Sequence, residues 1–310
     1  MSGHPVVTRR AALLGGLAVL AGCNGQAVPD LPELVLATGP PGAVFREIGA
    51  TLAGVLDRAL PDTRVVARET AASADNIRLL RDGEAQVGFS SLDAAVGDSG
   101  RPPEGMGALG RLYDSFLHLV VPADSSVASY GDLEGKRVSF GADGSGTEFI
   151  MKRLADLTGL DVRETLLDQA ESADALTAGE LDAMFSLTGV PTPAVSRLTA
   201  AHQGRFIELR GQADRLADAY PAPYIPATIP ATAYVDVHAT PTVAVPNILL
   251  ARSDLPDEVA RIITETVFTQ SAAIAADRPE AAHINVRTGI ATGPVPLHPG
   301  AQRWFRERKS

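Results

Sequence analysis

The residues best suited to chemistry in this chain lie in a glycine-rich loop, GADGSGT, at positions 141–147. The loop follows an apolar segment, 137–140, that is expected to be a strand, and it precedes an expected helix from about Thr147 to Leu157. Free N–H groups at a helix start, with the hydroxyls of Ser145 and Thr147, can surround a small anion. A tight turn with positive φ at its glycines is the alternative interpretation.

The spacing of these glycines does not fit a nucleotide site. Gly141 and Gly146 have the spacing of a P-loop, but Thr147 and Glu148 stand where that motif needs Lys and then Ser or Thr. The pattern G-x-G-x-x-G is absent as well. We therefore expect a small polar ligand and no nucleotide cofactor, with contacts from Gly144, Ser145, Gly146 and Thr147.

A comparable loop, TGPPG at positions 38–42, lies in the first half of the chain. Thr38 and Gly39 follow an expected strand, and Phe45 lies one turn into an expected helix that runs from Val44 to about Leu60. Phe45 is either a wall on which a ligand stacks or a core contact, and the sequence leaves both open. Two such loops facing each other would hold an anion from two sides.

The two loops belong to a longer repeat. GEAQVGFS (83–90) follows the first loop and GELDAMFS (179–186) follows the second, and these octets match at Gly, Glu, Phe and Ser. The repeat is too long for a solenoid period and indicates two copies of one α/β half. Each copy would offer the carboxyl end of a strand beside a helix start, where polar ligands bind.

Alternating apolar runs and helical patterns favour βαβ units with a parallel core. Two further apolar runs, Phe116–Val121 and Thr242–Ala251, are expected to cross between the halves as hinge strands. We predict lobe 1 as 33–118 plus 249–310 and lobe 2 as 119–248, with a ligand between them. Other expectations are a helix from Ser73 with Ser73 and Asp75 as candidate caps, a helix over Pro256–Ala276, an irregular segment over Ala213–Thr240, and a tail from Ile290 that wraps lobe 1.

The arrangements that catalysis or metal binding requires are not found in the sequence. The six histidines show no ligand spacing, Ser145 lacks a G-x-S-x-G elbow, and no His–acid pair or carboxylate pair stands out. The formal net charge of −10 opposes nucleic-acid binding. We expect ligand binding without turnover, hence no enzyme, no metal, no cofactor and no nucleic acid.

The first 22 residues have the pattern of an export signal. Arg9 and Arg10 precede an uncharged stretch, 11–21, that is too short to cross a bilayer as a helix. Leu20-Ala21-Gly22-Cys23 resembles the bacterial lipobox, which implies removal of residues 1–22 and lipidation of Cys23. Residues 23–32 would then tether the protein to the outer face of the cytoplasmic membrane. A buried thiol in a core helix is the alternative.

Taken together, these motifs resemble those of the TAXI-type solute receptors of TRAP transporters. GADGSGT is similar to the family's G-x-x-G-S-G-T, TGPPGAVF to T-G-x-x-G-G-x-Y, and TAASADN (70–76) to T-G-G-S-x-x-N. The segments 179–195, 240–250 and 296–307 also resemble family signatures. The resemblance implies an α/β, two-lobed, type II periplasmic-binding (flytrap) fold with two crossing hinge strands. It implies a small carboxylated solute, such as glutamate or a dicarboxylate, a TRAP membrane permease as partner, and further contacts from Ser73, Asn76 and Gly189.

Departures from the family pattern leave the solute open. Phe45 and Arg46 replace two tyrosines, and Ala71 and Ala72 replace two glycines. Two other functions also remain open. One is a ligand-sensing subunit for a membrane histidine kinase, and the other, with less support, is an extracytoplasmic hydrolase.

Overall fold

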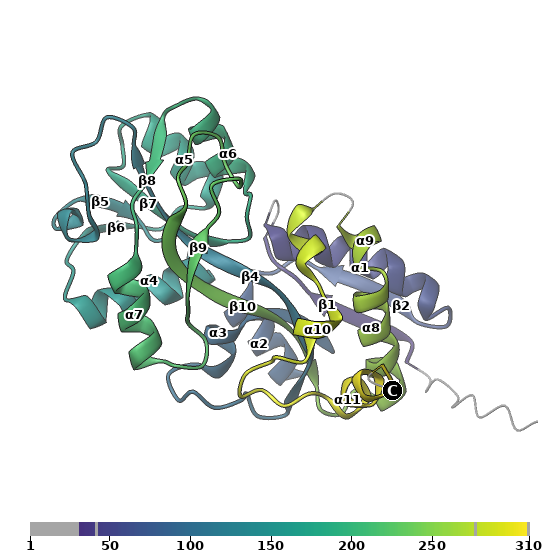
Figure 1. The fold of residues 1–310 in the computed structure, drawn as a ribbon. Coiled ribbons are helices and arrows are strands. Elements are labelled where there is room, and N and C mark those ends of the chain that lie inside the picture. The colour runs from purple at the N-terminus through teal and green to yellow at the C-terminus, as the bar shows by residue number, and fades with distance from the viewer. Residues whose placement is uncertain (1–30, 41–42, 276–277, 309–310) are drawn as a thin grey trace, which may run out of the picture.

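Two lobes joined by two long strands make up the molecule (Figure 1). The computed structural model describes residues 31–40, 43–275 and 278–308. Strands β4 (Met106–Pro122) and β10 (Thr240–Arg252) pair antiparallel and run from one lobe into the other. The predicted pair of crossing strands is therefore confirmed.

Within the described residues, one sheet of ten strands passes through both lobes, with the main order β2-β1-β3-β10-β4-β7-β5-β6. The central pair β10 and β4 separates two parallel triplets, each with its first strand in the middle. Lobe 1 contains β1 (Glu33–Ala37), β2 (Arg64–Arg68) and β3 (Val87–Ser91). Lobe 2 contains β5 (Arg137–Ser139), β6 (Arg163–Thr165), β7 (Ala183–Thr188), β8 (Gly204–Phe206) and β9 (Ile225–Ile229).

The octet repeat of the sequence has the same local structure in both lobes. Gly83 and Gly179 end the preceding helical segment at φ +77° and +72°, a conformation that favours glycine. Three residues after these glycines, and directly before β3 and β7, the side chains of Gln86 and Asp182 accept hydrogen bonds from the backbone N–H groups of Val35 (2.8 Å) and Arg137 (2.9 Å). The two side chains therefore hold equivalent strands, β1 and β5, against β3 and β7.

The helices of lobe 1 cover its triplet of strands on both faces. The first, α1 (Val44–Ala59), begins at the predicted residue and ends one residue early, and it buries Ile48, Leu52 and Leu56 at helical spacing. The others are α2 (Ser73–Asp82), α3 (Leu92–Val96), α8 (Asp257–Thr269), α9 (Ser271–Ile274), η2 (Pro279–His283), α10 (Val286–Gly289) and α11 (Pro299–Glu307). Helix α11 packs against α8, so the tail lies over lobe 1 as predicted.

Lobe 2 repeats this layering around its own strands. Its main helix, α4 (Gly146–Thr158), follows β5 and packs against β7 and α7. The remaining helical segments are η1 (Tyr130–Leu133), α5 (Gln169–Thr177), α6 (Pro193–Ala200) and α7 (Arg210–Ala219).

The buried apolar side chains form separate clusters in the two lobes. Along β4 the clusters of lobe 1 end at Tyr113 and those of lobe 2 begin at Phe116, while along β10 they separate between Val245 and Ile248. The register of β4 and β10 shifts between Pro246 and Ile248 and again between Leu249 and Leu250. The hinge strands therefore depart from regular pairing close to where the cores separate. The lobe boundaries predicted at 118/119 and 248/249 stay a prediction.

The structure differs from the sequence-based expectations in four places. Strand β4 begins at Met106 rather than Phe116, because pairing with β10 continues through this segment. Its Gly and Arg residues interrupt the apolar run from which a strand would be predicted. The segment 213–240 contains most of α7 and all of β9, and the expected helix over 256–276 is broken at Gln270. Ser73 is not the cap of α2: the residue before it, Ala72, takes that position at φ +89°, and the Ser73 hydroxyl bonds elsewhere.

Candidate functional site

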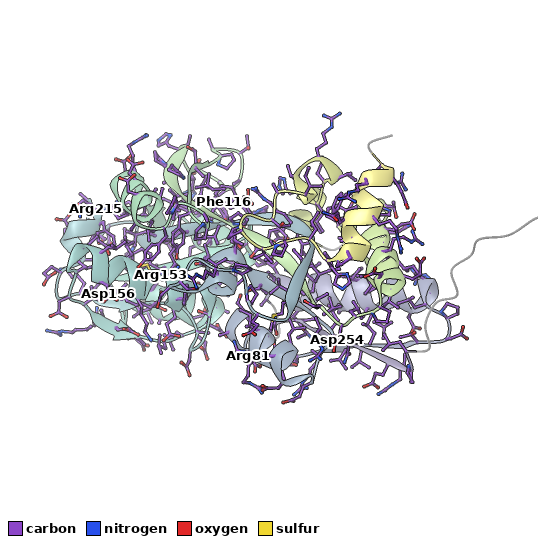
Figure 2. All side chains as sticks on the ribbon, turned by 90° about the horizontal axis from the view of Figure 1, so that it is seen from below. Arg81, Phe116, Arg153, Asp156, Arg215 and Asp254 are labelled. Carbon is purple, nitrogen blue, oxygen red and sulfur yellow. The ribbon has the colours of Figure 1, made fainter. Side chains whose placement is uncertain are left out.

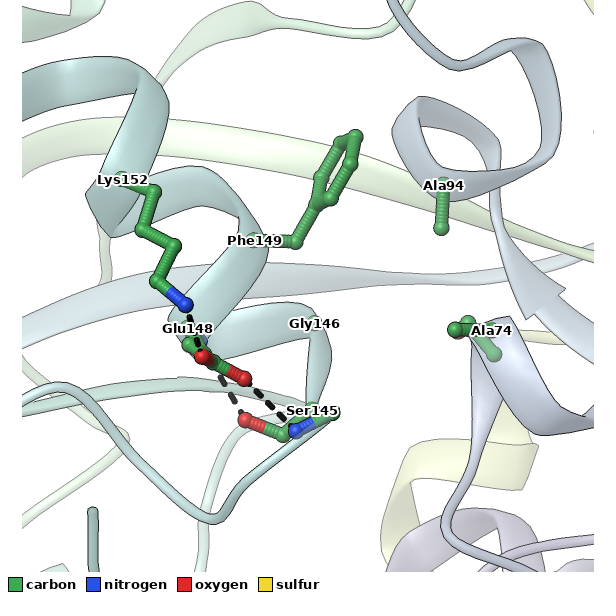
Figure 3. A pocket seen from close by; sticks show the side chains of 9 residues that line it. Ala74, Ala94, Ser145, Gly146, Glu148, Phe149 and Lys152 are labelled. Atoms are coloured by element: carbon green, nitrogen blue, oxygen red, sulfur yellow. Dashed lines mark hydrogen bonds and ion pairs between the residues drawn. The ribbon is translucent and has the colours of Figure 1, made fainter. Parts of the chain in front are cut away.

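A pocket of about 150 Å³ lies between the two lobes, at the starts of α2 and α4. Figure 3 shows its two walls, with α4 and its loop on one side and Ala74 and Ala94 on the other. Four of its lining residues were predicted as ligand contacts: Ser73 of lobe 1 and Gly144, Ser145 and Gly146 of lobe 2. The lining residues are Ser73, Ala74, Ala94, Gly144, Ser145, Gly146, Glu148, Phe149 and Lys152.

The α4 wall begins with the glycine-rich loop predicted from the sequence. Gly141 and Gly144 have φ of +86° and +68°, and a Cβ on Gly141 would lie 2.6 Å from the Thr147 Cβ. The Ser145 hydroxyl caps α4 by accepting a hydrogen bond from the N–H of Glu148 at 3.2 Å. The glycines are therefore needed for the turn, and the turn aims the first amides of α4 at the pocket.

One carboxylate of the protein already lies against this loop. The Oε2 atom of Glu148 accepts a hydrogen bond from the Gly144 N–H at 2.6 Å, and its Oε1 atom forms an ion pair with Lys152 (Figure 3). The hydrogen bond from the Lys152 ammonium to the Glu148 Oε1 raises the pKa of Lys152, so the ammonium group stays charged. An ammonium group carries three N–H donors, so Lys152 can also bind a second acceptor in the pocket.

The opposite wall is the start of α2, with α3 beside it. The Ser73 side chain is buried, and its Oγ accepts a hydrogen bond from the N–H of Ser91 at 3.1 Å. Ala74 and Ala94 present only methyl groups, which leaves room for a ligand. The first N–H groups of α2 have no partner within the helix. Two helix starts, one from each lobe, therefore face the same space.

Several predicted contacts use their side chains within one lobe instead. The buried Thr38 hydroxyl donates to the Arg68 carbonyl at 2.6 Å, and Thr147 Oγ1 accepts from the Leu187 N–H at 2.9 Å. The Asn76 amide donates to the carbonyls of Thr38 (2.7 Å) and Phe89 (2.8 Å). Thr38 and Asn76 thus bond to carbonyl groups at strand ends, and Thr147 joins the start of α4 to β7. A ligand role for these side chains stays a prediction.

Phe45 contacts the lobe 1 core, and a ligand role for it stays a prediction. Its ring stacks on Phe89 with centroids 5.3 Å apart and meets Tyr113 edge-on at 6.5 Å. A Cβ on Gly39 would lie 3.2 Å from the Phe45 Cβ, so Gly39 allows this ring to pack closely. Phe45 is a half-buried contact of the lobe 1 core, and neither it nor Gly39 lines the pocket.

Gly189 marks a second close approach between the lobes. A Cβ there would clash with Glu280 of η2, whose own Cβ would be 3.0 Å away. Burial raises the pKa of Glu280, and its Oε2 atom has no hydrogen-bond partner among the described residues. Gly189 therefore lies where η2 of lobe 1 meets the loop after β7, outside the pocket.

Sequence reasoning missed the pocket residues that follow the loop on α4. Glu148 and Lys152 are four residues apart, a spacing that places them on one face of a helix, and Phe149 lies beside them. This spacing was the available signal. Ala74 and Ala94 gave none, because their contribution is the space that they leave.

No group of His, Cys, Asp and Glu side chains that could hold a metal ion occurs in the described part of the chain. No described helix is long and apolar enough to cross a membrane. Residues 1–22, Cys23 and most of the predicted tether lie outside the described residues.

Comparison with known families gives a match over nearly the whole described chain. The profile of the NMT1-like family matches residues 36–308. The chain belongs to the NMT1-like family. The match includes both repeats, both crossing strands and all the residues of the pocket.

Solved structures share the fold of this NMT1-like protein. The periplasmic aliphatic sulphonate binding protein SsuA from Escherichia coli is 17% identical, with a TM-score of 0.51 over 90% of this chain and 79% of that chain. The periplasmic binding protein BugD is 11% identical, with a TM-score of 0.52 over 91% of this chain and 98% of that chain. A third structure, described as a periplasmic transporter, is 13% identical, with a TM-score of 0.53 over 91% and 94%. The predicted α/β, two-lobed periplasmic-binding fold is confirmed.

Proposed function

We propose that this NMT1-like protein is an extracytoplasmic solute receptor that captures a small solute between its lobes and delivers it to a membrane permease. The pocket between the starts of α2 and α4 carries this proposal. A site shared by two lobes on hinge strands suits capture and release, because binding and closure are then linked. Membership of the NMT1-like family and the periplasmic binding proteins of the same fold support it.

The pocket limits the size and charge of the solute. A cavity of 150 Å³ accommodates a molecule about as large as benzene, which suits a small organic acid. Two helix starts and the Lys152 ammonium favour a carboxylate. The motifs that resemble TAXI receptors lead us to propose a carboxylated solute and a TRAP permease as partner, whereas SsuA, by its name, binds sulphonates.

The first prediction is that a small carboxylate stabilises the purified protein and is released unchanged. Solute at about 100 times its dissociation constant would raise the unfolding free energy by roughly 2.7 kcal/mol. A thermal-shift panel of amino acids, mono- and dicarboxylates and sulphonates measures this, and mass spectrometry of the recovered compound tests for turnover. If no compound shifts the melting temperature, the receptor proposal fails; a chemically altered compound would favour the hydrolase.

A matched pair of variants tests whether the solute occupies this pocket. Ala74 is the second residue of α2 and lines the pocket, whereas Ala170 is the exposed second residue of α5 and does not. Ala74→Leu should fill the space and abolish the solute-induced shift, while the solute-free melting temperature stays close to wild type. Ala170→Leu should keep the full shift. Equal shifts in both variants would place the solute elsewhere.

The second prediction concerns membrane attachment through Cys23. Stable anchoring needs more than one acyl chain, which a bacterial diacylglyceryl group provides. In cells that process lipoproteins, mass spectrometry should find a mature chain that begins at a lipidated Cys23. Cys23→Ser should move the protein from the membrane fraction to the soluble fraction. An unmodified Cys23 at the mature N-terminus would refute the anchor without affecting the solute proposal.

A further inference from the structure

Beside the pocket, four residues outside its lining join the two lobes by polar contacts. Asp93 on α3 and Asp98 just after it belong to lobe 1, where α3 packs on α2, β3 and β10. Arg153 on α4 and Tyr224, which precedes β9, belong to lobe 2. We call these four residues the clasp. Figure 2 shows the clasp residue Arg153 on the teal and green lobe, together with Asp156 and Arg215.

Hydrogen bonds run through the clasp from lobe to lobe. Arg153 donates from Nη2 to the Asp98 Oδ1 at 2.7 Å and from Nη1 to the Tyr224 hydroxyl at 3.1 Å. The Tyr224 hydroxyl in turn donates to the Asp93 Oδ2 at 3.1 Å. Both carboxylates of lobe 1 therefore have a partner in lobe 2. Asp93, Arg153 and Tyr224 are buried, whereas Asp98 is exposed.

The surroundings of Arg153 determine how much its contacts with lobe 1 stabilise the closed form. Its guanidinium carbon lies 4.3 Å from the ring centroid of Phe149 and 4.3 Å from that of Tyr220, and both rings belong to lobe 2. Because these rings and Arg153 belong to the same lobe, the rings can stabilise the cation by cation–π attraction in either arrangement of the lobes. Lobe 2 therefore supplies part of the stabilisation that offsets the cost of burying this cation, whereas Asp93 of lobe 1 is buried against it, and burial raises the pKa of Asp93.

We propose that the clasp holds the lobes closed in the absence of solute. Lobe 2 carries the Arg153 cation between two aromatic rings. Lobe 1 supplies Asp98 as the partner of Arg153 and Asp93 as the partner of Tyr224, and these contacts form only when the lobes are closed. Rotation about β4 and β10 would separate Arg153 from Asp98 and Tyr224 from Asp93 at once, while the contact between Arg153 and Tyr224 stays within lobe 2. The solute-free protein is thus mainly closed, and solute enters through a minor open form, whichever solute the pocket takes.

The clasp is also connected to the pocket. Phe149 lines the pocket and stacks on Arg153, so it belongs to both environments. A solute that contacts Phe149 would be held beside the clasp. The closed form is therefore favoured by two neighbouring contributions, one from the protein alone and one from the solute.

Distance measurements between the lobes test the proposal in solute-free protein. The chain has one cysteine, Cys23, so full-length protein with Cys23→Ser can carry spin labels at Arg81→Cys on α2 and Arg215→Cys on α7, both exposed and labelled in Figure 2. Pulsed electron paramagnetic resonance should give one short distance for this background. Tyr224→Phe, which removes one hydroxyl, should lower the closed-to-open ratio by about tenfold.

A surface variant and its control keep the test independent of folding. Asp98→Ala changes an exposed residue and should lower the closed-to-open ratio by up to about fivefold, since one partner is solvated. Asp174→Ala breaks the exposed pair with Arg197 within lobe 2 and should leave the distances unchanged. A long distance in the unsubstituted background, or unchanged distances in both Tyr224→Phe and Asp98→Ala, would overturn the clasp. Neither result would bear on solute binding, which the thermal-shift panel measures separately.

Discussion

Lowering the pH from 6.5 to 4 is expected to remove roughly 3 kcal/mol of unfolding free energy through one histidine, His118. This residue on β4 is fully buried, and burial lowers its pKa from 6.5 to about 4. Its Nδ1 lies 2.8 Å from the Phe116 carbonyl, and its Nε2 lies 2.8 Å from the Tyr234 hydroxyl. The neutral ring therefore donates from Nδ1 and accepts at Nε2.

The sign of this effect follows from the two pKa values. Between pH 6.5 and 4 the unfolded chain binds a proton at His118 and the folded protein does not, so the stability falls as the pH falls through this range. Below the folded pKa both states are protonated and this contribution no longer changes.

Urea unfolding at several pH values, compared between variants, measures the contribution of His118. His118→Gln can keep one donor and one acceptor without titrating, so its stability should depend less on pH than that of the wild type. His238→Gln changes an exposed histidine and should keep the wild-type slope. Identical pH profiles for His118→Gln and the wild type would show that His118 does not titrate as expected.

The second large effect is expected from Gly300→Ala in α11. A Cβ at this position would clash with the backbone carbonyl oxygen of Asp257 and would lie 2.9 Å from the Ala260 Cβ, both in α8. Because the obstacle includes backbone, α11 must move away from α8. We expect a loss of about 3 kcal/mol, at the upper end of the usual cost of overpacking.

Gly211 provides the control, since it is the second residue of α7 just as Gly300 is the second residue of α11. A Cβ on Gly211 meets nothing within 4 Å. Gly211→Ala should therefore raise the unfolding free energy by about 0.5–1 kcal/mol, because Ala favours a helix more than Gly does. Thermal denaturation of both variants shows the opposite signs; a stable Gly300→Ala would mean that α11 packs less closely on α8.

The sequence predicted the elements whose signal is local. Helices α1 and α4 were predicted to within one residue at each end, because apolar spacing and glycine punctuation encode them directly. The first half of β4 was missed because its partner, β10, is more than a hundred residues away in the sequence. Strand β9 was missed because it lies in a Pro-rich stretch. Strand pairing is a tertiary property that a local pattern does not contain.

The candidate site was predicted on one wall better than on the other. Gly144, Ser145 and Gly146 line the pocket, since a glycine-rich loop before a helix has a local signature. Thr38 is a predicted ligand contact because it follows a strand in the first glycine loop, and Asn76 because its segment, 70–76, resembles a family motif. In the structure they bond to strand-end carbonyls of their own lobe. A sequence does not show which buried backbone groups still need a hydrogen-bond partner. It therefore cannot tell a polar side chain that binds a ligand from one that bonds to the backbone of its own lobe.

The register shifts in the β4–β10 ladder have a mechanical consequence. The shift between Pro246 and Ile248 lies where the two apolar cores separate, so bending at that point would leave the packing of each core in place. The resistance of the hinge to bending therefore depends on a few peptide units of β4 and β10, while solute recognition depends on the pocket residues at the starts of α2 and α4. Substitutions near Pro246 could change how fast the protein opens without changing what it recognises, and pocket substitutions could do the reverse.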